Sequence, residues 1–209
     1  MHRVAVIDYG MGNLRSVSKA LEAVASEHEV IVTADAKAIS NASHIVFPGV
    51  GAIRDCMSTL QQTGLDDIVR TAAASKPFLG ICLGMQALMS HSEENSGTEG
   101  LGIIPGNVRY FDQAAAKGLK VPHMGWNQVS QRLHPLWQNI NDDSRFYFVH
   151  SYYVDPQTEQ SIAGVSDYSL KFASAVTRDN VFAVQFHPEK SQHAGLQLLK
   201  NFLDWDGQS

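Results

Sequence analysis

Cys82 is the residue of this chain best placed to act as a nucleophile. It lies in the segment 80–84, GICLG, between an apolar run at residues 77–81 that predicts a buried strand and a following stretch with the spacing of a packed helix. Glycines two residues before and two after a nucleophile permit the sharp strand-to-helix turn that lifts the reactive atom clear of the backbone. The helix N-terminus would also stabilise a thiolate. The alternative is a buried structural cysteine, since unpaired cysteines are often packing residues.

A thiol nucleophile needs a base and a group that orients the base, and His187 and Glu189 suit these two roles. They follow an apolar strand expected at residues 181–186, and Pro188 between them favours extended backbone at His187. Two residues apart, the imidazole and the carboxylate can project to the same side, where the carboxylate would select the imidazole tautomer. Taken alone, this segment is weak evidence, because His and Glu are ordinary residues at the start of a loop. Together with the cysteine turn, it predicts a Cys-His-Glu constellation.

A third segment, residues 48–51 (PGVG), follows an apolar strand and predicts a loop with accessible backbone N–H groups. With the N–H of Leu83, which follows the nucleophile, such groups could form an oxyanion hole for acyl transfer. A plain strand-to-helix turn is the alternative for this segment alone. The Gly-x-Gly of residues 8–13 also follows a strand, but it lacks the third glycine of a dinucleotide loop and does not predict a nucleotide site.

The elements that must position these residues alternate between strand and helix in the first half of the chain, which predicts an α/β fold with a doubly wound, mostly parallel central sheet flanked by helices. Strands are expected at residues 4–8, 29–32, 44–47 and 78–82, with helices at 14–25, 53–62, 65–74 and 83–91. Shorter strands are expected later, at residues 107–111, 146–154, 162–165, 173–177 and 181–186, before a last helix at 192–205. Residues 113–118 are expected to form an exposed loop.

Composition narrows the classes of function. The 209 residues, of which 44% are hydrophobic, suit a single domain over residues 1–209. A formal net charge of −5 without a Lys/Arg cluster argues against nucleic acid as a partner. No apolar run is long enough for a membrane span, and the first residues predict a strand rather than a signal peptide.

The cysteines and histidines indicate neither a disulfide framework nor a metal site. Two cysteines, Cys56 and Cys82, are typical of a reducing compartment, and we expect Cys56 to be inert packing on the helix after residue 51. The nine histidines are dispersed without metal-ligand spacing, so we expect no metal. His28, His44 and His134 are expected at the surface.

These segments resemble the class I (triad) glutamine amidotransferases, through residues 80–86 (GICLGMQ) and 185–189 (QFHPE). Within that class the chain is most similar to the glutaminase subunits of imidazole glycerol phosphate synthase, through residues 8–17, 48–51, 122–127 and 146–152. The resemblance extends over nearly the whole chain. It implies the flavodoxin-like fold of a class I glutamine amidotransferase domain.

The resemblance also implies a role for each matched residue. Cys82 would be the nucleophile, His187 the general base and acid, and Glu189 the orienting carboxylate. The oxyanion segment, in which the family implies a peptide rearrangement, would comprise Gly49, Val50 and Gly51, with Leu83. Substrate would be held by Gln86, Glu94, Ser151 and Tyr152. A partner subunit would lie near Asn13, Trp126, Tyr147 and Lys190.

The activity implied by the resemblance is hydrolysis of L-glutamine to glutamate and ammonia in the cytoplasm, without a cofactor. The ammonia would pass to a separate cyclase subunit, a (β/α)8 barrel that forms a heterodimer with this chain. There it would serve the synthesis of imidazole glycerol phosphate and aminoimidazole carboxamide ribonucleotide in histidine biosynthesis. Neither a nucleic acid nor a membrane is an expected partner.

Three other functions compete with this one. The chain could serve another synthase, such as those that make pyridoxal phosphate, anthranilate or GMP, although residues 8–13 and 125–127 count against this. A cysteine at a similar turn could belong to a peptidase or γ-glutamyl hydrolase, which a preference for peptides over free glutamine would favour. A redox sensor or chaperone with a reversibly oxidised Cys82 is the non-enzymatic alternative, but it would need neither Glu189 nor Gln86.

Overall fold

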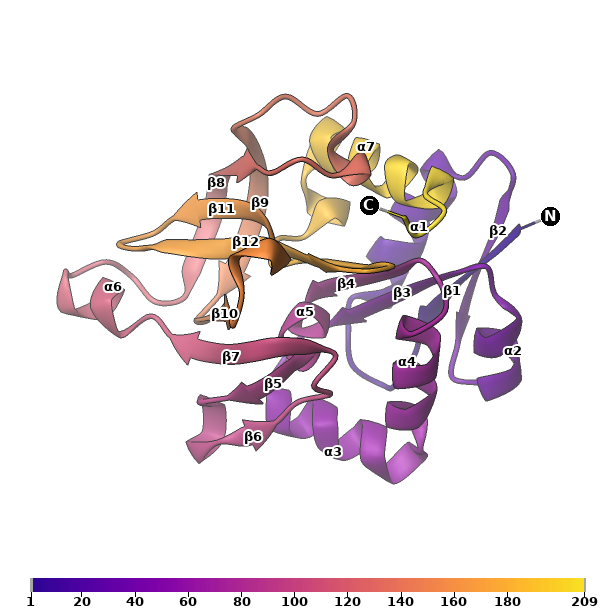
Figure 1. The fold of residues 1–209 in the computed structure, drawn as a ribbon, viewed down its shortest axis with the longest axis horizontal. Coiled ribbons are helices and arrows are strands. Elements are labelled where there is room, and N and C mark those ends of the chain that lie inside the picture. The colour runs from indigo at the N-terminus through magenta and orange to yellow at the C-terminus, as the bar shows by residue number, and fades with distance from the viewer. Residues whose placement is uncertain (1, 209) are drawn as a thin grey trace.

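Five parallel strands form one half of the sheet in the computed structural model, which describes residues 2–208. Their order is β2 (His28–Thr33), β1 (His2–Ile7), β3 (His44–Gly49), β4 (Phe78–Cys82) and β13 (Val181–Val184) (Figure 1). Every residue of β3, β4 and β13 is buried, as expected of central strands covered on both faces. The nucleophile turn lies at the carboxyl end of β4, between β3 and β13.

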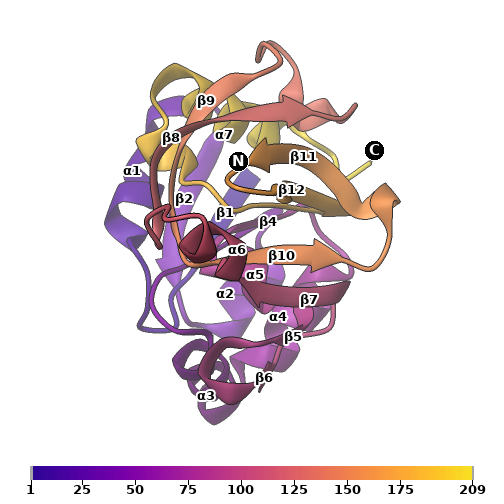
Figure 2. The ribbon, with the colours of Figure 1, turned by 90° about the vertical axis from the view of Figure 1, so that its left-hand side faces the viewer.

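A mostly antiparallel region continues the sheet beyond β13. The strands follow in the order β12 (Lys171–Arg178), β10 (Tyr152–Pro156), β7 (Ile104–Tyr110), β5 (Met89–Ser92) and β6 (Thr98–Glu99). Of these strands, only β5 and β7 pair in parallel. A branch from β12 consists of β11 (Ile162–Asp167), β8 (His123–Gln131) and β9 (Ser144–His150). This branch stands across the end of the sheet that is far from β2 (Figure 2).

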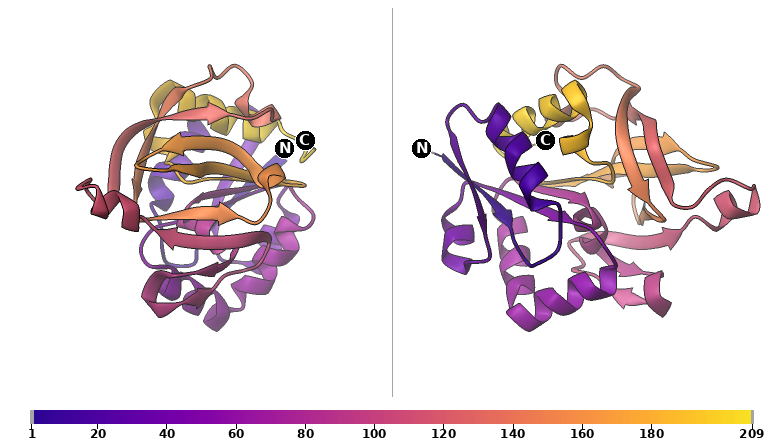
Figure 3. Two further views of the ribbon diagram at one scale, coloured as in Figure 1. Left: turned by 60° about the vertical axis from the view of Figure 1, so that its left-hand side comes forward. Right: turned by 180° about the vertical axis from the view of Figure 1, so that it is seen from behind.

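Helices cover both faces of the parallel half (Figure 3). α1 (Leu14–Val24) and α7 (Gln192–Asp204) lie on one face, and α2 (Ala36–Asn41), α3 (Ile53–Thr63) and α4 (Leu65–Ala73) lie on the other. Successive side chains of β1 alternate between the two cores: Val4 and Val6 pack with α1 and α7, while Ala5 and Ile7 pack with the other three helices. Within residues 2–208, no helix is long and apolar enough to span a membrane.

The predicted doubly wound fold with a mostly parallel central sheet is confirmed, and most elements begin and end within two residues of the expected positions. Two long elements were predicted wrongly. The helix expected over residues 83–91 ends early, as α5 (Leu83–Ala87), because residues 89–92 form β5 and pair with β7. The strand expected over residues 146–154 is divided at Ser151 into β9 and β10, which pair with different strands.

Several elements had no clear sequence signal. Residues 113–118, expected as an exposed loop, contribute to the helix α6 (Asp112–Ala116), in which Ala114 is buried. The elements α2, β5, β6 and β8 were not expected. Along β8 only His123 and Val129 are buried, so its apolar pattern is too sparse to predict a strand.

The expectation that three histidines lie at the surface was wrong for His44 and His134, which are buried, whereas His28 is half-buried. The ring nitrogen Nε2 of His44 lies 2.9 Å from the carbonyl oxygen of Trp205, and Nδ1 of His134 accepts the N–H of Leu136 at 3.2 Å. Burial lowers the pKa of both imidazoles, to about 4 for His134. Neutral imidazoles with satisfied nitrogens are therefore accommodated in the core.

Candidate active site

Cys82 occupies a strained turn between β4 and α5, with φ of 56° and ψ of −113°. Positive φ is rare for a residue with a side chain and is typical of the sharp turn that presents a nucleophile. The turn brings α5 so close to β3 that a Cβ atom at Gly84 would overlap the carbonyl oxygen of Phe47. The predicted position of Cys82 at a strand-to-helix junction is confirmed. Its side chain reaches a cavity of about 350 Å³.

Residues from distant parts of the chain line this cavity. Its walls are formed by the loop after β3, the start of α5, the 3-10 turn η1 (Glu94–Ser96), and the junction of β9 and β10. The lining residues are Val50, Gly51, Cys82, Leu83, Gln86, Glu94, Pro122, Val149, His150, Ser151, Tyr152 and His187. All except Pro122, Val149 and His150 belong to the site predicted from the sequence. Gly49 lies behind the wall, paired with Cys82 across β3 and β4.

His187 and Glu189 lie together beside the cavity. His187 follows β13, and Glu189 lies in the 3-10 turn η4 (Pro188–Lys190). Nδ1 of His187 is 2.8 Å from Oε1 of Glu189, and the side chains are only 3% and 0% exposed. Because a carboxylate only accepts, Nδ1 carries the proton of the neutral imidazole. Nε2 has no hydrogen-bond partner among the described residues and is therefore available to accept the proton of Cys82.

The imidazole of His187 is poised to hold a proton. Burial by itself lowers its pKa, but the neighbouring Cys82 and Glu189 side chains favour the imidazolium and raise the pKa to about 9. The sulfur is therefore close enough to His187 to change its proton affinity, although no regular hydrogen bond joins Nε2 to Sγ. An imidazolium next to a thiol favours the thiolate, so the pair is suited to nucleophilic attack on a carbonyl carbon.

The comparisons with known proteins agree with this geometry. The family model Glutamine amidotransferase class-I matches residues 5–205. The chain is 61% identical over 210 residues, and over the full length of both proteins, to imidazole glycerol phosphate synthase subunit HisH of Nitrosococcus oceani. It is 57% identical to the subunit of the same name in Acinetobacter baylyi, over 99% of this chain and 100% of that protein. The chain belongs to the HisH family of class-I glutamine amidotransferases.

The fold of this HisH family member also occurs in solved structures. A crystal structure described as a glutamine amidotransferase has a TM-score of 0.72 at 17% identity, over 96% of this chain and 97% of that chain. At this identity the likeness shows the shared fold alone. The predicted resemblance to class I glutamine amidotransferases is thus confirmed, and the peptidase and redox-sensor alternatives are not supported.

Glu94 connects the cavity of this HisH protein with α3. Its Oε2 accepts the backbone N–H of Ile53, the first residue of α3, at 3.1 Å. Free N–H groups at a helix N-terminus favour a carboxylate. Glu94 itself is followed by Asn95, Ser96 and Gly97, all at positive φ, in a tight turn. The same carboxylate therefore lines the cavity and anchors the end of the loop that follows β3.

Three of the four residues expected near a partner subunit lie close together. The ring centroids of Trp126 in β8 and Tyr147 in β9 are 6.1 Å apart, and Nζ of Lys190 lies 5.8 Å from the Tyr147 centroid. Trp126 is 43% exposed and the nearby Met124 is 66% exposed, which leaves apolar surface at this cluster. Asn13 lies at the N-terminus of α1, which packs against η4.

Two further residues near the base were missed by sequence reasoning. Ser191 Oγ donates to the carbonyl oxygen of His187 at 2.6 Å and accepts the N–H of Tyr147 at 3.0 Å. His150 lines the cavity at the end of β9. Ser191 lies two residues after the segment 185–189, and this proximity was a local signal, whereas His150 had no such signal. Among residues 2–208, no group of three or more His, Cys, Asp or Glu side chains is arranged to hold a metal ion.

Proposed function

We propose that this chain is the glutaminase subunit of imidazole glycerol phosphate synthase, hydrolysing L-glutamine and passing ammonia to a cyclase subunit. The observation that best supports this function is the convergence of Cys82, His187 and Glu189 beside one cavity in a chain 61% identical to a HisH subunit. The cavity of about 350 Å³ is at the small end of ligand sites, which favours a free amino acid over a peptide. We further propose that residues 1–209 act as one glutamine amidotransferase domain.

The first half of the reaction forms a thioester. Cys82 transfers its proton to Nε2 of His187, and the thiolate attacks the side-chain amide carbon of glutamine, placing negative charge on the amide oxygen. The N–H of Leu83 and an N–H of the segment 49–51 stabilise this oxyanion. His187 then protonates the amide nitrogen as the C–N bond breaks. Ammonia leaves, and a glutamyl thioester remains on Cys82.

The second half releases glutamate. His187 removes a proton from water while the water oxygen attacks the thioester carbon, and the C–S bond breaks with the electron pair returning to sulfur. Throughout, Glu189 holds the imidazole in one orientation and stabilises its protonated form. The sum is glutamine plus water giving glutamate plus ammonia, with the enzyme unchanged.

The lining of the cavity supports a set of substrate contacts. The carboxylate of Glu94 binds the α-ammonium group of glutamine, and Gln86 with the backbone of Ser151 and Tyr152 positions the amino-acid end. This leaves the side-chain amide directed toward Cys82.

The partner is a cyclase subunit, a (β/α)8 barrel that docks over Asn13, Trp126, Tyr147 and Lys190 to form a heterodimer. Exposed aromatic and apolar side chains support an interface at this cluster. Ammonia is a nucleophile only while unprotonated, so direct transfer avoids its loss as ammonium in bulk water. The two unpaired cysteines suit reaction in the reducing cytoplasm.

The test compares glutamate release by the purified chain alone, with the cyclase subunit, and with the cyclase plus its nucleotide ligand. We expect slow turnover alone and stimulation in the third mixture, because ligand and partner binding are coupled to the glutaminase site. A Cys82→Ser variant should abolish glutamine-dependent synthesis but leave synthesis from added ammonium salt. Absence of stimulation in the third mixture would reject the assignment. Loss of both reactions in the variant would indicate damaged folding or docking.

A further inference from the structure

Gln185 is a fully buried residue to which the mechanism above gives no role. It follows β13, two residues before His187, and its backbone N–H donates to the carbonyl oxygen of Ser174 at 2.9 Å. Its side-chain Nε2 donates to Sγ of Cys82 at 3.8 Å. Its Oε1 accepts the side-chain N–H of Gln86 at 3.0 Å. One buried amide therefore contacts both the nucleophile and a residue of the cavity wall.

The orientation of this amide is determined by a backbone carbonyl. Nε2 of Gln86 also donates to the carbonyl oxygen of Tyr152 at 3.1 Å, and a carbonyl can only accept. Nε2 of Gln86 therefore donates one N–H to this carbonyl and its second N–H to Gln185. Gln185 accepts this hydrogen bond through its side-chain oxygen. The NH₂ group of Gln185 is left facing Cys82. The sulfur thus meets a hydrogen-bond donor and not an acceptor.

A second series of hydrogen bonds holds the same carbonyl. Nδ1 of His150 lies 2.8 Å from the carbonyl oxygen of Tyr152, and Nε2 of His150 lies 2.8 Å from Nδ1 of His123. Since the carbonyl accepts, His150 carries its proton on Nδ1, and His123 must donate to His150. Burial lowers the pKa of His150 to about 3 and that of His123 to about 4, so both stay neutral near pH 7.

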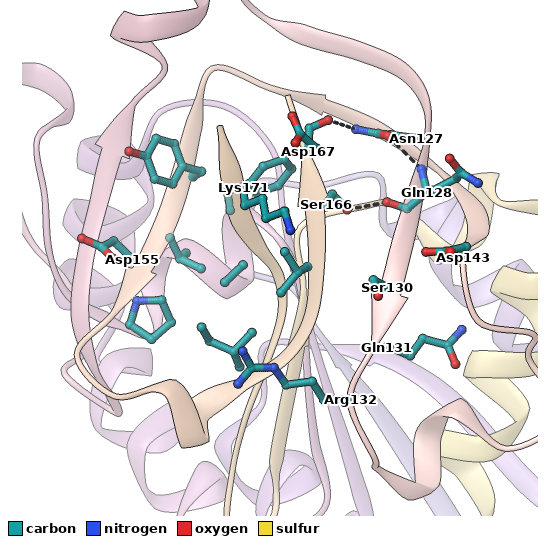
Figure 4. A pocket seen from close by; sticks show the side chains of 17 residues that line it. Asn127, Gln128, Ser130, Gln131, Arg132, Asp143, Asp155, Ser166, Asp167 and Lys171 are labelled. Atoms are coloured by element: carbon teal, nitrogen blue, oxygen red, sulfur yellow. Dashed lines mark hydrogen bonds between the residues drawn. The ribbon is translucent and has the colours of Figure 1, made fainter. Parts of the chain in front are cut away.

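The outer end of the series is anchored at Asn127, whose Nδ2 lies 3.3 Å from Nε2 of His123. The second N–H of this amide donates to the carbonyl oxygen of Asp167 at 2.9 Å, as Figure 4 shows at the rim of a neighbouring cavity. Its oxygen accepts the N–H of Gln128 at 2.8 Å. Each group therefore donates a hydrogen bond to the next, from Asn127 through the two histidines to the carbonyl oxygen of Tyr152.

We propose that the side-chain amide of Gln185 donates a hydrogen bond to Sγ of Cys82 that favours the thiolate, and that Gln86 is the positioning residue that orients this amide. The inference rests on the proposed role of Cys82 as the nucleophile. A hydrogen bond to an ionised acceptor is stronger than one to its neutral form, so a directed N–H lowers the free energy of the thiolate relative to the thiol. A buried donor also keeps its position without reorganisation as charge develops on the sulfur.

Other ionisable groups around the sulfur have different effects. His187 accepts the proton of Cys82, and Tyr9 lies close to Cys82 but stays neutral, because burial raises its pKa far above the usual range. Glu94 and His150 line the same cavity as Cys82. The contribution of Gln185 differs from all of these because its amide does not titrate.

The test is the pH dependence of Cys82 alkylation by iodoacetamide in a Cys56→Ser background, where Cys82 is the single thiol. Gln185→Met removes the donor at similar length, and Gln185→Glu turns a carboxylate oxygen toward the sulfur. We expect the apparent pKa of alkylation to rise by about one pH unit in the Met variant, which is about tenfold less thiolate well below that pKa. The Glu variant should show a larger rise.

Ser174→Ala is the matched control, since its buried Oγ has no hydrogen-bond partner among the described residues and its backbone contact to Gln185 would remain. The control profile should match the parent. If the pH profiles of alkylation of the Gln185 variants coincide with the parent profile, the proposal is overturned. If neither Gln185 variant folds, as judged by circular dichroism, the Gln86→Met variant provides the test. The proposal requires that the apparent pKa of alkylation rises in this variant too, and an unchanged pH profile of alkylation would overturn it.

Alkylation needs neither glutamine nor a partner subunit. An absence of glutamine hydrolysis would therefore count against the proposed function, while an unchanged alkylation profile would count against the role of Gln185.

Discussion

The backbone N–H of His187 donates to the carbonyl oxygen of Tyr147 at 2.9 Å. The proposed base is thereby tied to β9, the strand that carries a residue of the exposed aromatic cluster. Ser191 closes a small ring between them, because its hydroxyl accepts from Tyr147 and donates to the carbonyl oxygen of His187. A change in β9 is thus connected by short hydrogen bonds to the backbone that carries the imidazole.

Ser191→Ala should weaken the positioning of His187. The substitution removes both hydrogen bonds of the hydroxyl and should lower the free energy of unfolding by about 1–3 kcal/mol. We expect kcat for glutamine to fall by about tenfold with little change in KM, because proton transfer depends on the placement of the imidazole. Steady-state kinetics and urea unfolding measure the two effects.

Ser166→Ala is the control for this prediction. Ser166 is also buried, and its hydroxyl donates to the carbonyl oxygen of Gln128 at 2.7 Å on the outer branch of the sheet. We expect the Ser166→Ala variant to have a lower free energy of unfolding and an unchanged kcat for glutamine. Equal losses of kcat in both variants would show that Ser191 acts only through stability.

The contacts of His187 with Cys82 and Glu189 should make stability depend on pH. The folded-state pKa of His187 is raised to about 9 from an ordinary value of 6.5, so the folded protein binds the proton more tightly than the unfolded chain. The stabilisation is fully present below pH 6.5 and is lost as the pH rises through 9. It amounts to on the order of 3 kcal/mol for this buried imidazole. Urea unfolding at several pH values between 6 and 10 measures the decline.

Glu189→Gln should reduce this pH dependence, because the neutral amide no longer favours the imidazolium and only the contribution of Cys82 remains. The solvent-exposed pair of His91 and Glu99, with Nδ1 and Oε1 3.0 Å apart, provides a matched control. Glu99→Gln should leave the decline unchanged, since water screens exposed pairs. An undiminished decline in the Glu189 variant would assign the pH dependence to other groups.

Glu94 variants should separate substrate binding from loop anchoring. In Glu94→Gln the amide oxygen can still accept the N–H of Ile53, but the charge that would bind the α-ammonium group is gone. We expect KM for glutamine to rise by about 10- to 100-fold with kcat nearly unchanged. Glu94→Ala also frees the start of α3 and should lower kcat as well. A Gln variant with as low a kcat as the Ala variant would contradict the separation.

Trp126→Ala should weaken cyclase binding. A large, partly exposed aromatic residue beside Tyr147 has the properties of an interface hot spot, whose loss costs about 2 kcal/mol or more in binding. We expect Kd to rise by about 30-fold in calorimetric titration, with unchanged glutamine hydrolysis by the isolated chain. Leu133→Ala, at a fully exposed residue outside this cluster, is the control and should bind as the parent does. Equal affinities for all three proteins would place the interface elsewhere.

Sequence reasoning succeeded where the signal was local. The bounds of β4 were predicted correctly because an uninterrupted apolar run ends at a glycine-flanked turn. It failed where pairing partners are remote: residues 89–92 have helical spacing after α5, yet they pair with β7. His44 looked like a surface residue because its hydrogen-bond partner, Trp205, lies 161 positions away.

The sequence by itself determined the chemistry that the site can perform, because the thiol turn and the His-Pro-Glu segment each depend on only a few neighbouring residues. Only the tertiary structure decided which groups meet. Gln185 and Cys82 are 103 positions apart and come into contact because β13 pairs with β4. Ser191 reaches Tyr147 because η4 packs against β9. Hydrogen bonds of this kind depend on strand order and register, which no local pattern of residues specifies.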